Sequence, residues 1–225
     1  MAINLSKGQK IDLTKETGEK LTNFCVGVNW GAIETTTKGI FGSKKIIEDV
    51  DLDLSCIMTD GSGNLVDHIY SPDYNGFLQR NNLPLGKLTS IDGSLRHSGD
   101  DRQGDQGGDD GLDNEIITVD LNKVNSRIEK IFFFINIYLN QGQNFDFSHI
   151  PYAKIRMYEG SSTKVNKVFS NYDITTDSTF ANKRALILGK LYKRNGDWKF
   201  DAIGDPTEDR IFSETIQLII EKYAK

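Results

Sequence analysis

The chain has 225 residues, a hydrophobic fraction of 37% and a formal net charge of −5 at pH 7. Twelve Phe and eight Tyr within that fraction suffice for a packed core, which excludes wholesale disorder. No apolar run is long enough to cross a bilayer, and the opening MAINLSKGQKIDL lacks a secretory signal, so we expect a cytoplasmic protein without direct membrane insertion. Cys25 and Cys56 have no CxxC spacing, and we expect both to be reduced core thiols.

The negative charge is concentrated in one segment. Residues 97–115 hold seven acids and one base, Arg102, so this segment carries −6 and the remaining residues sum to about +1. A surface with this charge disfavours nucleic acid as a partner.

Most of the chain has the pattern of β-strands. DVDLDLSCIM (49–58) alternates between an apolar and a polar face, and the turn residues 59–64 lead to 65–71 as a hairpin partner. The segment RIEKIFFFINIYL (127–139) has a continuous apolar run, which is typical of a strand inside a sheet that is covered on both faces. Further strands are expected at 116–121, 152–160, 185–196 and 197–204, the last two joined by an Asn195-Gly196 turn. We predict an all-β fold, a two-sheet β-sandwich with an acidic glycine-rich loop, as a single domain over 1–225.

Two segments are expected to be helical. Residues 207–225 place Phe212, Ile216, Ile219, Ile220 and Tyr223 on one stripe, with Glu208 and Asp209 in the favourable first turn. We predict a short C-terminal helix packed on the sandwich, with partner binding as the alternative. Residues 76–80 suit a single helical turn, and the aromatic residues of YSPDYNGF (70–77) fit core packing or a contact surface.

The dense carboxylates of the acidic segment repel one another unless a positive charge lies among them or the segment is solvated and disordered. Glycines at 99, 104, 107, 108 and 111 allow tight bends in this segment. On the 49–58 strand, Asp51 and Asp53 occupy alternate positions, which lie about 7 Å apart on one face. An oxygen-only donor set selects a hard cation, and calcium accepts six to eight such ligands. We therefore predict a calcium site, without the spacing of an EF-hand, from Asp51, Asp53, Asp100, Asp101, Asp105, Asp109, Asp110, Asp113 and Glu115.

Five segments, in this order, resemble the TerD family of bacterial tellurite-resistance and stress proteins: LSKGQKIDLTK (5–15), DLDLSC (51–56), HSGDDRQGD (97–105), DNEIITVDL (113–121) and GKLYKRNGDWKFDAIG (189–204). The resemblance implies a β-sandwich that binds two calcium ions, in a cytoplasmic protein linked to resistance against tellurite, other chemical stress and phage. By position it assigns Asp51, Asp53 and the loop acids as ligands, and it leaves the choice among Asp105, Asp109 and Asp110 open. The family's usual Gly-Trp-Asp appears here as residues 29–31, Asn-Trp-Gly, so one acidic group is missing.

Two functional classes remain open for the carboxylates, beside a third possibility in which the C-terminal helix or exposed strand edges only mediate assembly with related proteins or a membrane complex. The first is a non-enzymatic, calcium-dependent binding or scaffold module, whose partners would be related stress-resistance proteins or a membrane-associated complex. The alternative is a metal-dependent phosphoesterase that uses the same carboxylates. Such sites usually recruit histidines, of which the chain has three, and no nucleophile or phosphate-loop motif is present. His97, at the start of the acidic segment, either orients a carboxylate or makes a local structural hydrogen bond.

Overall fold

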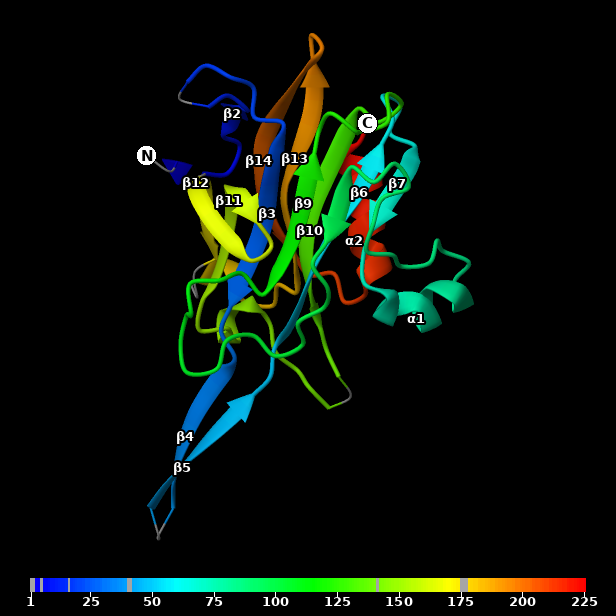
Figure 1. Cartoon of the computed structure of the whole chain (residues 1–225). Coiled ribbons are helices and arrows are strands. Elements are labelled where there is room, and N and C mark those ends of the chain that lie inside the picture. The colour runs from blue at the N-terminus through cyan, green and yellow to red at the C-terminus, as the bar shows by residue number, and fades with distance from the viewer. Residues whose placement is uncertain (1–2, 5, 16, 40–41, 141, 175–177) are drawn as a thin grey trace.

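The computed structural model of the chain describes residues 3–4, 6–15, 17–39, 42–140, 142–174 and 178–225. Two six-stranded sheets face each other in a sandwich (Figure 1), as predicted. The first sheet consists, in spatial order, of β1 (Ile3–Asn4), β12 (Lys164–Ile174), β11 (Ala153–Ser161), β3 (Asn23–Trp30), β9 (Glu115–Asp120) and β8 (Leu95–His97). The second consists of β2 (Lys10–Asp12), β14 (Asp197–Thr207), β13 (Ala185–Arg194), β10 (Lys130–Tyr138), β6 (Asp51–Thr59) and β7 (Leu65–Ile69).

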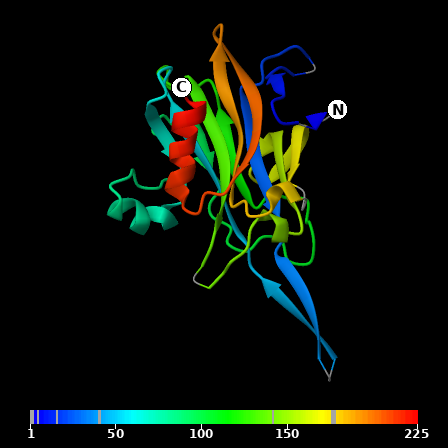
Figure 2. The ribbon, with the colours of Figure 1, turned by 180° about the vertical axis from the view of Figure 1, so that it is seen from behind.

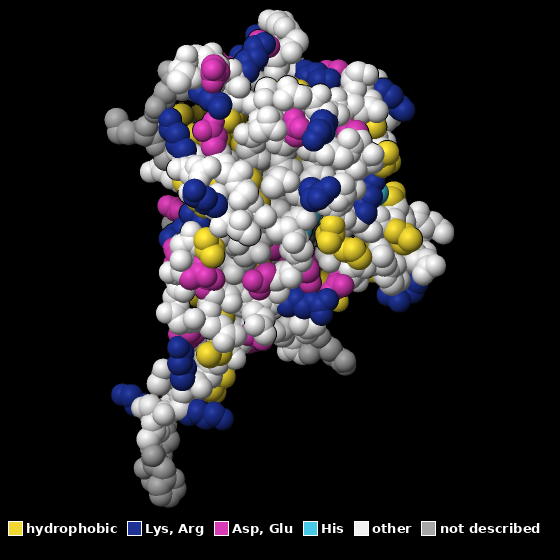
Figure 3. Space-filling view, in the orientation of Figure 1, with side chains coloured by type: hydrophobic (Ala, Val, Ile, Leu, Met, Phe, Trp, Pro, Cys, Tyr) yellow, Lys and Arg dark blue, Asp and Glu magenta, His cyan; other side chains and the backbone are white. Residues whose placement is uncertain are grey.

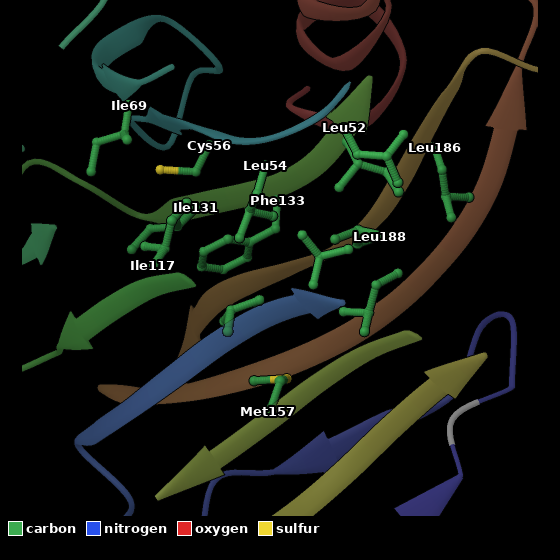
Figure 4. Close-up of a cluster of buried hydrophobic side chains, with 14 of the residues drawn as sticks. Leu52, Leu54, Cys56, Ile69, Ile117, Ile131, Phe133, Met157, Leu186 and Leu188 are labelled. Carbon is green, nitrogen blue, oxygen red and sulfur yellow. The ribbon is translucent and has the colours of Figure 1, made fainter. Parts of the chain in front are cut away.

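The main core lies between the two sheets (Figure 4). From β6 it receives Leu52, Leu54, Cys56 and Met58, so the apolar face predicted from the alternation is confirmed. Cys25 and Cys56 are both buried and free, as predicted, and burial raises the pKa of each thiol. The Asn195-Gly196 turn joins β13 and β14 with positive φ at both residues, which fits the hairpin turn that this dipeptide favours.

A second apolar cluster covers the outer face of the second sheet. Ile57 of β6 and Phe132 and Phe134 of β10 pack there against the helical segments. These segments are η1 (Pro72–Tyr74), α1 (Asn75–Arg80), α2 (Phe212–Leu218) and its π-helical continuation η4 (Ile219–Tyr223). Figure 2, which views the molecule from behind, shows α2 (red) lying over the outer face of this sheet. The prediction that residues 127–139 form a strand covered on both faces is therefore confirmed.

The C-terminal helix is shorter than predicted. It begins at Phe212, because β14 keeps its ladder with β13 as far as Thr207, whose carbonyl accepts the Arg184 N–H at 3.0 Å. The prediction that Glu208 and Asp209 lie in its first turn is wrong: Glu208 instead pairs with Lys183 at 2.8 Å. None of the helices in the described ranges is long and apolar enough to span a membrane.

Several elements had no clear signal in the sequence. Besides β1, β2, β3, β8 and β12, these are β4 (Ile33–Gly39), β5 (Gly42–Glu48), η2 (Phe147–His149) and η3 (Ser178–Phe180). Among the described strands, β4 and β5 pair only with each other, and they project from the sandwich as a hairpin (Figure 1). Their residues are rich in Thr and Lys and bury no continuous apolar face, so the hydrophobic periodicity that marks core strands is missing.

Candidate metal centre

The first residues of β6 supply two aspartates to the candidate site. Because alternation along β6 directs Leu52 and Leu54 into the core, Asp51 and Asp53 project from the opposite face. That face is covered here, since only 8% of Asp51 and 3% of Asp53 is exposed. The sequence predicted the shared face of these aspartates but not their burial.

Asp100 completes a group of three carboxylates, which we call the β6 cluster. It belongs to the loop that connects β8 to β9, residues 98–114, which we call the acidic loop. One oxygen each from Asp51, Asp53 and Asp100 lies within 4.8 Å of the other two. Arg102 offsets part of this charge, because its Nε donates to Asp100 Oδ2 at 2.8 Å while its terminal nitrogen pairs with Asp73.

The electrostatics of the β6 cluster disfavour three ionised carboxylates on their own. Burial, followed by the neighbouring carboxylates of Asp53, Asp100 and Glu115, raises the pKa of Asp51 to about 9. Burial also raises the pKa of Asp53 well above its ordinary value, although the Tyr74 hydroxyl donates a hydrogen bond to it. Asp51 Oδ1 is buried and accepts no hydrogen bond from any described residue. An added cation would relieve both the desolvation and the repulsion.

Glu115 fastens the acidic loop to β6. Its side chain is almost fully buried, and its Oε2 accepts the backbone N–H of Leu54 at 2.6 Å. Its Oε1 accepts the N–H of Asp101 at 3.2 Å. His97 Nε2 lies 3.3 Å from Oε2. Since His97 Nδ1 accepts the Gly99 N–H at 3.1 Å, the ring proton sits on Nε2. Burial lowers the pKa of His97 to about 4, so the ring is neutral near pH 7, and it lies between the Gly99 N–H and the Glu115 carboxylate.

The middle of the acidic loop is bound to the end of β3. Asp105 N donates to Trp30 O at 2.8 Å, and Ala32 N donates to Asp105 O at 2.9 Å. The Trp30 ring lies beneath Gly104, where an added Cβ would approach the ring to 2.5 Å. Gly104 and the other four glycines of the loop have positive φ, which confirms the tight bends expected from the sequence.

A second group of carboxylates, which we call the loop cluster, comes entirely from the acidic loop. Ligand oxygens of Asp105, Asp109 and Asp110 lie within 4.8 Å of one another. This cluster is better compensated than the β6 cluster. Tyr152 donates to Asp105 at 2.8 Å, and Lys154 pairs with Asp109 at 2.5 Å, which lowers the pKa of Asp109.

The structure thus brings six of the nine predicted ligands into two groups and gives the other three different partners. Asp101 accepts the backbone N–H groups of Gln103 and Gly104 at 2.9 and 3.1 Å. Asp113 pairs with Arg156 at 2.8 Å, and its carboxylate lies over Gly27, where an added Cβ would come 2.2 Å from Oδ2. Together with Glu115, these residues position the loop, and their role as ligands stays a prediction.

Sequence reasoning missed three neutral residues that surround the two clusters. Tyr74 and Tyr152 donate to Asp53 and Asp105 as described above. Asn29 Nδ2 donates to Asp105 Oδ2 at 3.2 Å, while its own Oδ1 is buried without a donor in the described part of the chain. The family's usual Gly-Trp-Asp has glycine at the position of Asn29. This difference was the signal in the sequence that could have pointed to Asn29. The aromatic residues of 70–77 gave a partial signal, and their core-packing interpretation is confirmed for Tyr70 and Tyr74.

The fold and these two clusters define a class of protein, a two-sheet β-sandwich with grouped carboxylates where the β8–β9 loop meets β6. A comparison with protein families matches the TerD domain over residues 1–217, and the chain belongs to the TerD family. It is 36% identical to general stress protein 16U of Bacillus subtilis, over 91% of this chain and 90% of that protein. It is 33% identical to the tellurium resistance protein TerD of Serratia marcescens, over 91% and 90% of the two chains.

Solved structures give the same architecture. A TerD homologue of Streptomyces coelicolor, SCO6318, matches with a TM-score of 0.58 at 13% identity, covering 91% of this chain and 98% of that one. A protein of unknown function, SAV2460, also matches with a TM-score of 0.58 at 16% identity, covering 85% and 93%. At this identity the likeness supports the sandwich fold alone. Another relative is the stress response protein SCP2 of Bacillus subtilis, 32% identical over 96% of this chain and 98% of that protein, so the family is of the tellurium-resistance and stress-response type.

Proposed function

We propose that the chain is a cytoplasmic, non-enzymatic, calcium-binding protein of the tellurium-resistance and stress-response type, and that the β6 cluster holds a calcium ion. One observation carries this proposal. Only 8% of Asp51 is exposed, and its Oδ1 accepts no hydrogen bond from the described residues. Two further carboxylates lie beside it. Such a group is stable in its ionised form only next to a cation or several donors.

The donor set favours calcium over softer or smaller metals. Both clusters contain only aspartate oxygens, without histidine or cysteine. Calcium accepts six to eight oxygens in flexible geometry, whereas magnesium requires octahedral geometry and keeps its waters. Asp51, Asp53 and Asp100 would hold the first ion, and Asp105, Asp109 and Asp110 a second. The Lys154 contact with Asp109 competes at the loop cluster, so we expect the β6 cluster to bind more tightly.

The connections of the acidic loop support the scaffold role that we propose. Glu115 links the loop to β6 and Asp105 links it to β3, so the loop spans both sheets. A bound calcium ion would neutralise the β6 cluster and thereby stabilise the loop in one arrangement. We propose that this ordered surface binds related stress-resistance proteins or a membrane-associated complex.

Calcium titration by calorimetry, with a thermal melt at each calcium concentration, tests the metal site. We expect wild-type protein to gain about 2.7 kcal/mol of stability at a hundredfold excess over Kd. Asp51→Asn should remove the larger part of that gain, the part that comes from the β6 cluster. Asp49→Asn is the matched control, because Asp49 is exposed, lies two residues away and belongs to neither cluster. Equal calcium responses in both variants, or none in the wild type, would refute the proposal.

The non-enzymatic part has its own test. Metal-dependent phosphoesterases usually recruit histidines beside the carboxylates, and the nearby His97 is buried with both ring nitrogens engaged by Gly99 and Glu115. We expect no hydrolysis of p-nitrophenyl phosphate with Mn²⁺ or Mg²⁺. Turnover that requires the metal and disappears in Asp51→Asn would show an enzyme instead.

A further inference from the structure

The β4–β5 hairpin, which we call the arm, packs against the sandwich through Ile33 at its base, and its other described residues project away from the core. Neither strand pairs with a strand of the two main sheets within the described residues, and every described residue from Glu34 to Lys38 and from Gly42 to Glu48 is exposed. An isolated two-stranded hairpin is only marginally stable in water. The arm therefore needs support at its base, and its projecting part is available for another role.

The acidic loop supplies that support. It holds one leg of the arm through the bond from Ala32 N to Asp105 O at 2.9 Å, and the other through the bond from Val50 N to Gln103 O at 3.3 Å. In addition, Glu34 Oε1 accepts the Gly107 N–H at 2.9 Å. The arm is thus fixed at its base to the body of the protein.

The outer part of the arm is cationic. Lys38, Lys44 and Lys45 lie there, whereas the two acids of the hairpin, Glu34 and Glu48, lie at the end next to the body. Lys45 pairs with Glu34 at 2.7 Å. Lys38 and Lys44 form no ion pair with any described residue. Figure 3 shows the basic side chains along the arm, below a band of acidic side chains on the body.

The lysines and the exposed isoleucines occupy both faces of the arm. From the register, Lys38, Lys45 and Ile47 share one face, because Thr36 pairs with Lys45 and Glu34 pairs with Ile47. Lys44 and Ile46 share the opposite face. Ile46 is 44% exposed and Ile47 is 41% exposed. Because the lysines lie on both faces near the outer end, a fluid anionic lipid surface can contact them in more than one orientation of the arm.

We propose that the arm docks this protein on a membrane surface rich in anionic lipids. The lysines of the outer part of the arm meet the lipid phosphates with their charged groups. The acids of the body do not cancel this attraction. An extended chain advances roughly 20 Å from Ala32 to Lys38, about twice the screening length at physiological salt. The inference is separate from the proposed calcium site, because the arm lysines belong to neither cluster.

Sedimentation with phospholipid vesicles tests the arm. The full chain is mixed with vesicles of phosphatidylcholine and phosphatidylglycerol, or of phosphatidylcholine alone, each in chelator and in calcium. The test variant is Lys38→Gln, Lys44→Gln and Lys45→Gln combined. Its matched control combines Lys20→Gln, Lys123→Gln and Lys164→Gln, which remove the same charge. The strand register places these three exposed residues at the opposite end of the sandwich from the arm.

We expect wild-type protein to bind the anionic vesicles, more weakly as salt rises, and to leave the neutral ones unbound. Each basic residue near an anionic surface raises partitioning roughly fivefold, so the arm variant should lose about a hundredfold and the control far less. A thermal melt checks that both variants stay folded. Absence of wild-type binding in both buffers, or equal loss in the two variants, would overturn the proposal. So would arm-dependent binding to poly-glutamate without binding to vesicles, which would indicate an acidic protein partner.

Discussion

The ring of Tyr74 stacks on the ring of Phe212, with centroids 4.3 Å apart and planes inclined by 18°. The hydroxyl of the same Tyr74 donates a hydrogen bond to Asp53 in the β6 cluster. One side chain thus connects the candidate metal centre to the first residue of α2. The charge state of the cluster should therefore influence how firmly the C-terminal helix is held.

Tyr74→Phe isolates the hydroxyl, because it keeps the ring and its stacking. We expect it to destabilise the calcium-free protein by about 0.5–1.5 kcal/mol while Asp53 is protonated, and by up to about 3 kcal/mol once Asp53 is ionised. The loss should grow as the pH rises and Asp53 ionises. Tyr70→Phe is the control, since the Tyr70 hydroxyl donates to the neutral Pro84 carbonyl at 2.8 Å. Urea unfolding in chelator measures both variants, and a pH-independent loss in Tyr74→Phe would contradict the link.

The stability of the calcium-free protein should fall between pH 7 and pH 9. The pKa of Asp51 is about 9 in the folded state against an ordinary 3.8, so the folded protein keeps a proton that the unfolded chain has released. Each such group lowers the unfolding free energy by about 1.4 kcal/mol per pH unit while it stays protonated. Asp53 and Glu115, whose pKa values are also raised by burial, act in the same direction.

His97 does not contribute to the change in stability between pH 7 and pH 9. Its lowered pKa of about 4, against an ordinary 6.5, adds stability only as the pH rises between those two values. Urea unfolding at pH 7, 8 and 9 in chelator gives the slope directly. Asp51→Asn should flatten the slope, and saturating calcium should also flatten it, because the metal displaces the proton from the same oxygens in the folded state. Stability that increases over this range without metal would show that the carboxylates are not desolvated as described.

The ion pair between Asp113 and Arg156 should be strongly coupled. The Asp113 side chain is fully buried, and burial raises its pKa while Arg156 opposes that change. Arg156→Met leaves a buried carboxylate without its cation and should cost about 3–5 kcal/mol. Adding Asp113→Asn should recover much of that loss, and urea unfolding of the two single variants and the double variant measures the coupling. Additive losses would mean that the two side chains do not interact.

The sequence predicted those parts of the fold that depend on local pattern. Alternation identified β6 and its core face, the apolar run identified β10, and Asn195-Gly196 identified the β13–β14 turn. The arm was missed because its strands bury no face, and periodicity reports burial rather than strand geometry. The start of α2 was misplaced because the pairing of Thr207 with β13 depends on tertiary contacts that the first-turn acids do not reveal.

The candidate site was predicted in composition but not in arrangement. Counting charges located the acids, and their spacing gave Asp51 and Asp53 a shared face. The division into two clusters depends on loop bonds between segments far apart in the chain, such as Glu115 to Leu54 and Asp105 to Trp30. Neutral donors such as Tyr74 carry no charge pattern, so their contacts with the acids emerge only from the fold.

Phe212→Ala tests whether the C-terminal helix is part of the core. Phe212 is 4% exposed and contacts the rings of Tyr70, Tyr74 and Phe134. Its truncation should cost about 3–5 kcal/mol, because the cavity lies among rigid aromatic rings and cannot collapse fully. Ile211→Ala is the matched control, since the neighbouring Ile211 is 47% exposed and should lose well under half as much. Urea unfolding compares the two, with the native mass measured alongside. A dimer lost in Phe212→Ala at unchanged monomer stability would assign the helix to assembly instead.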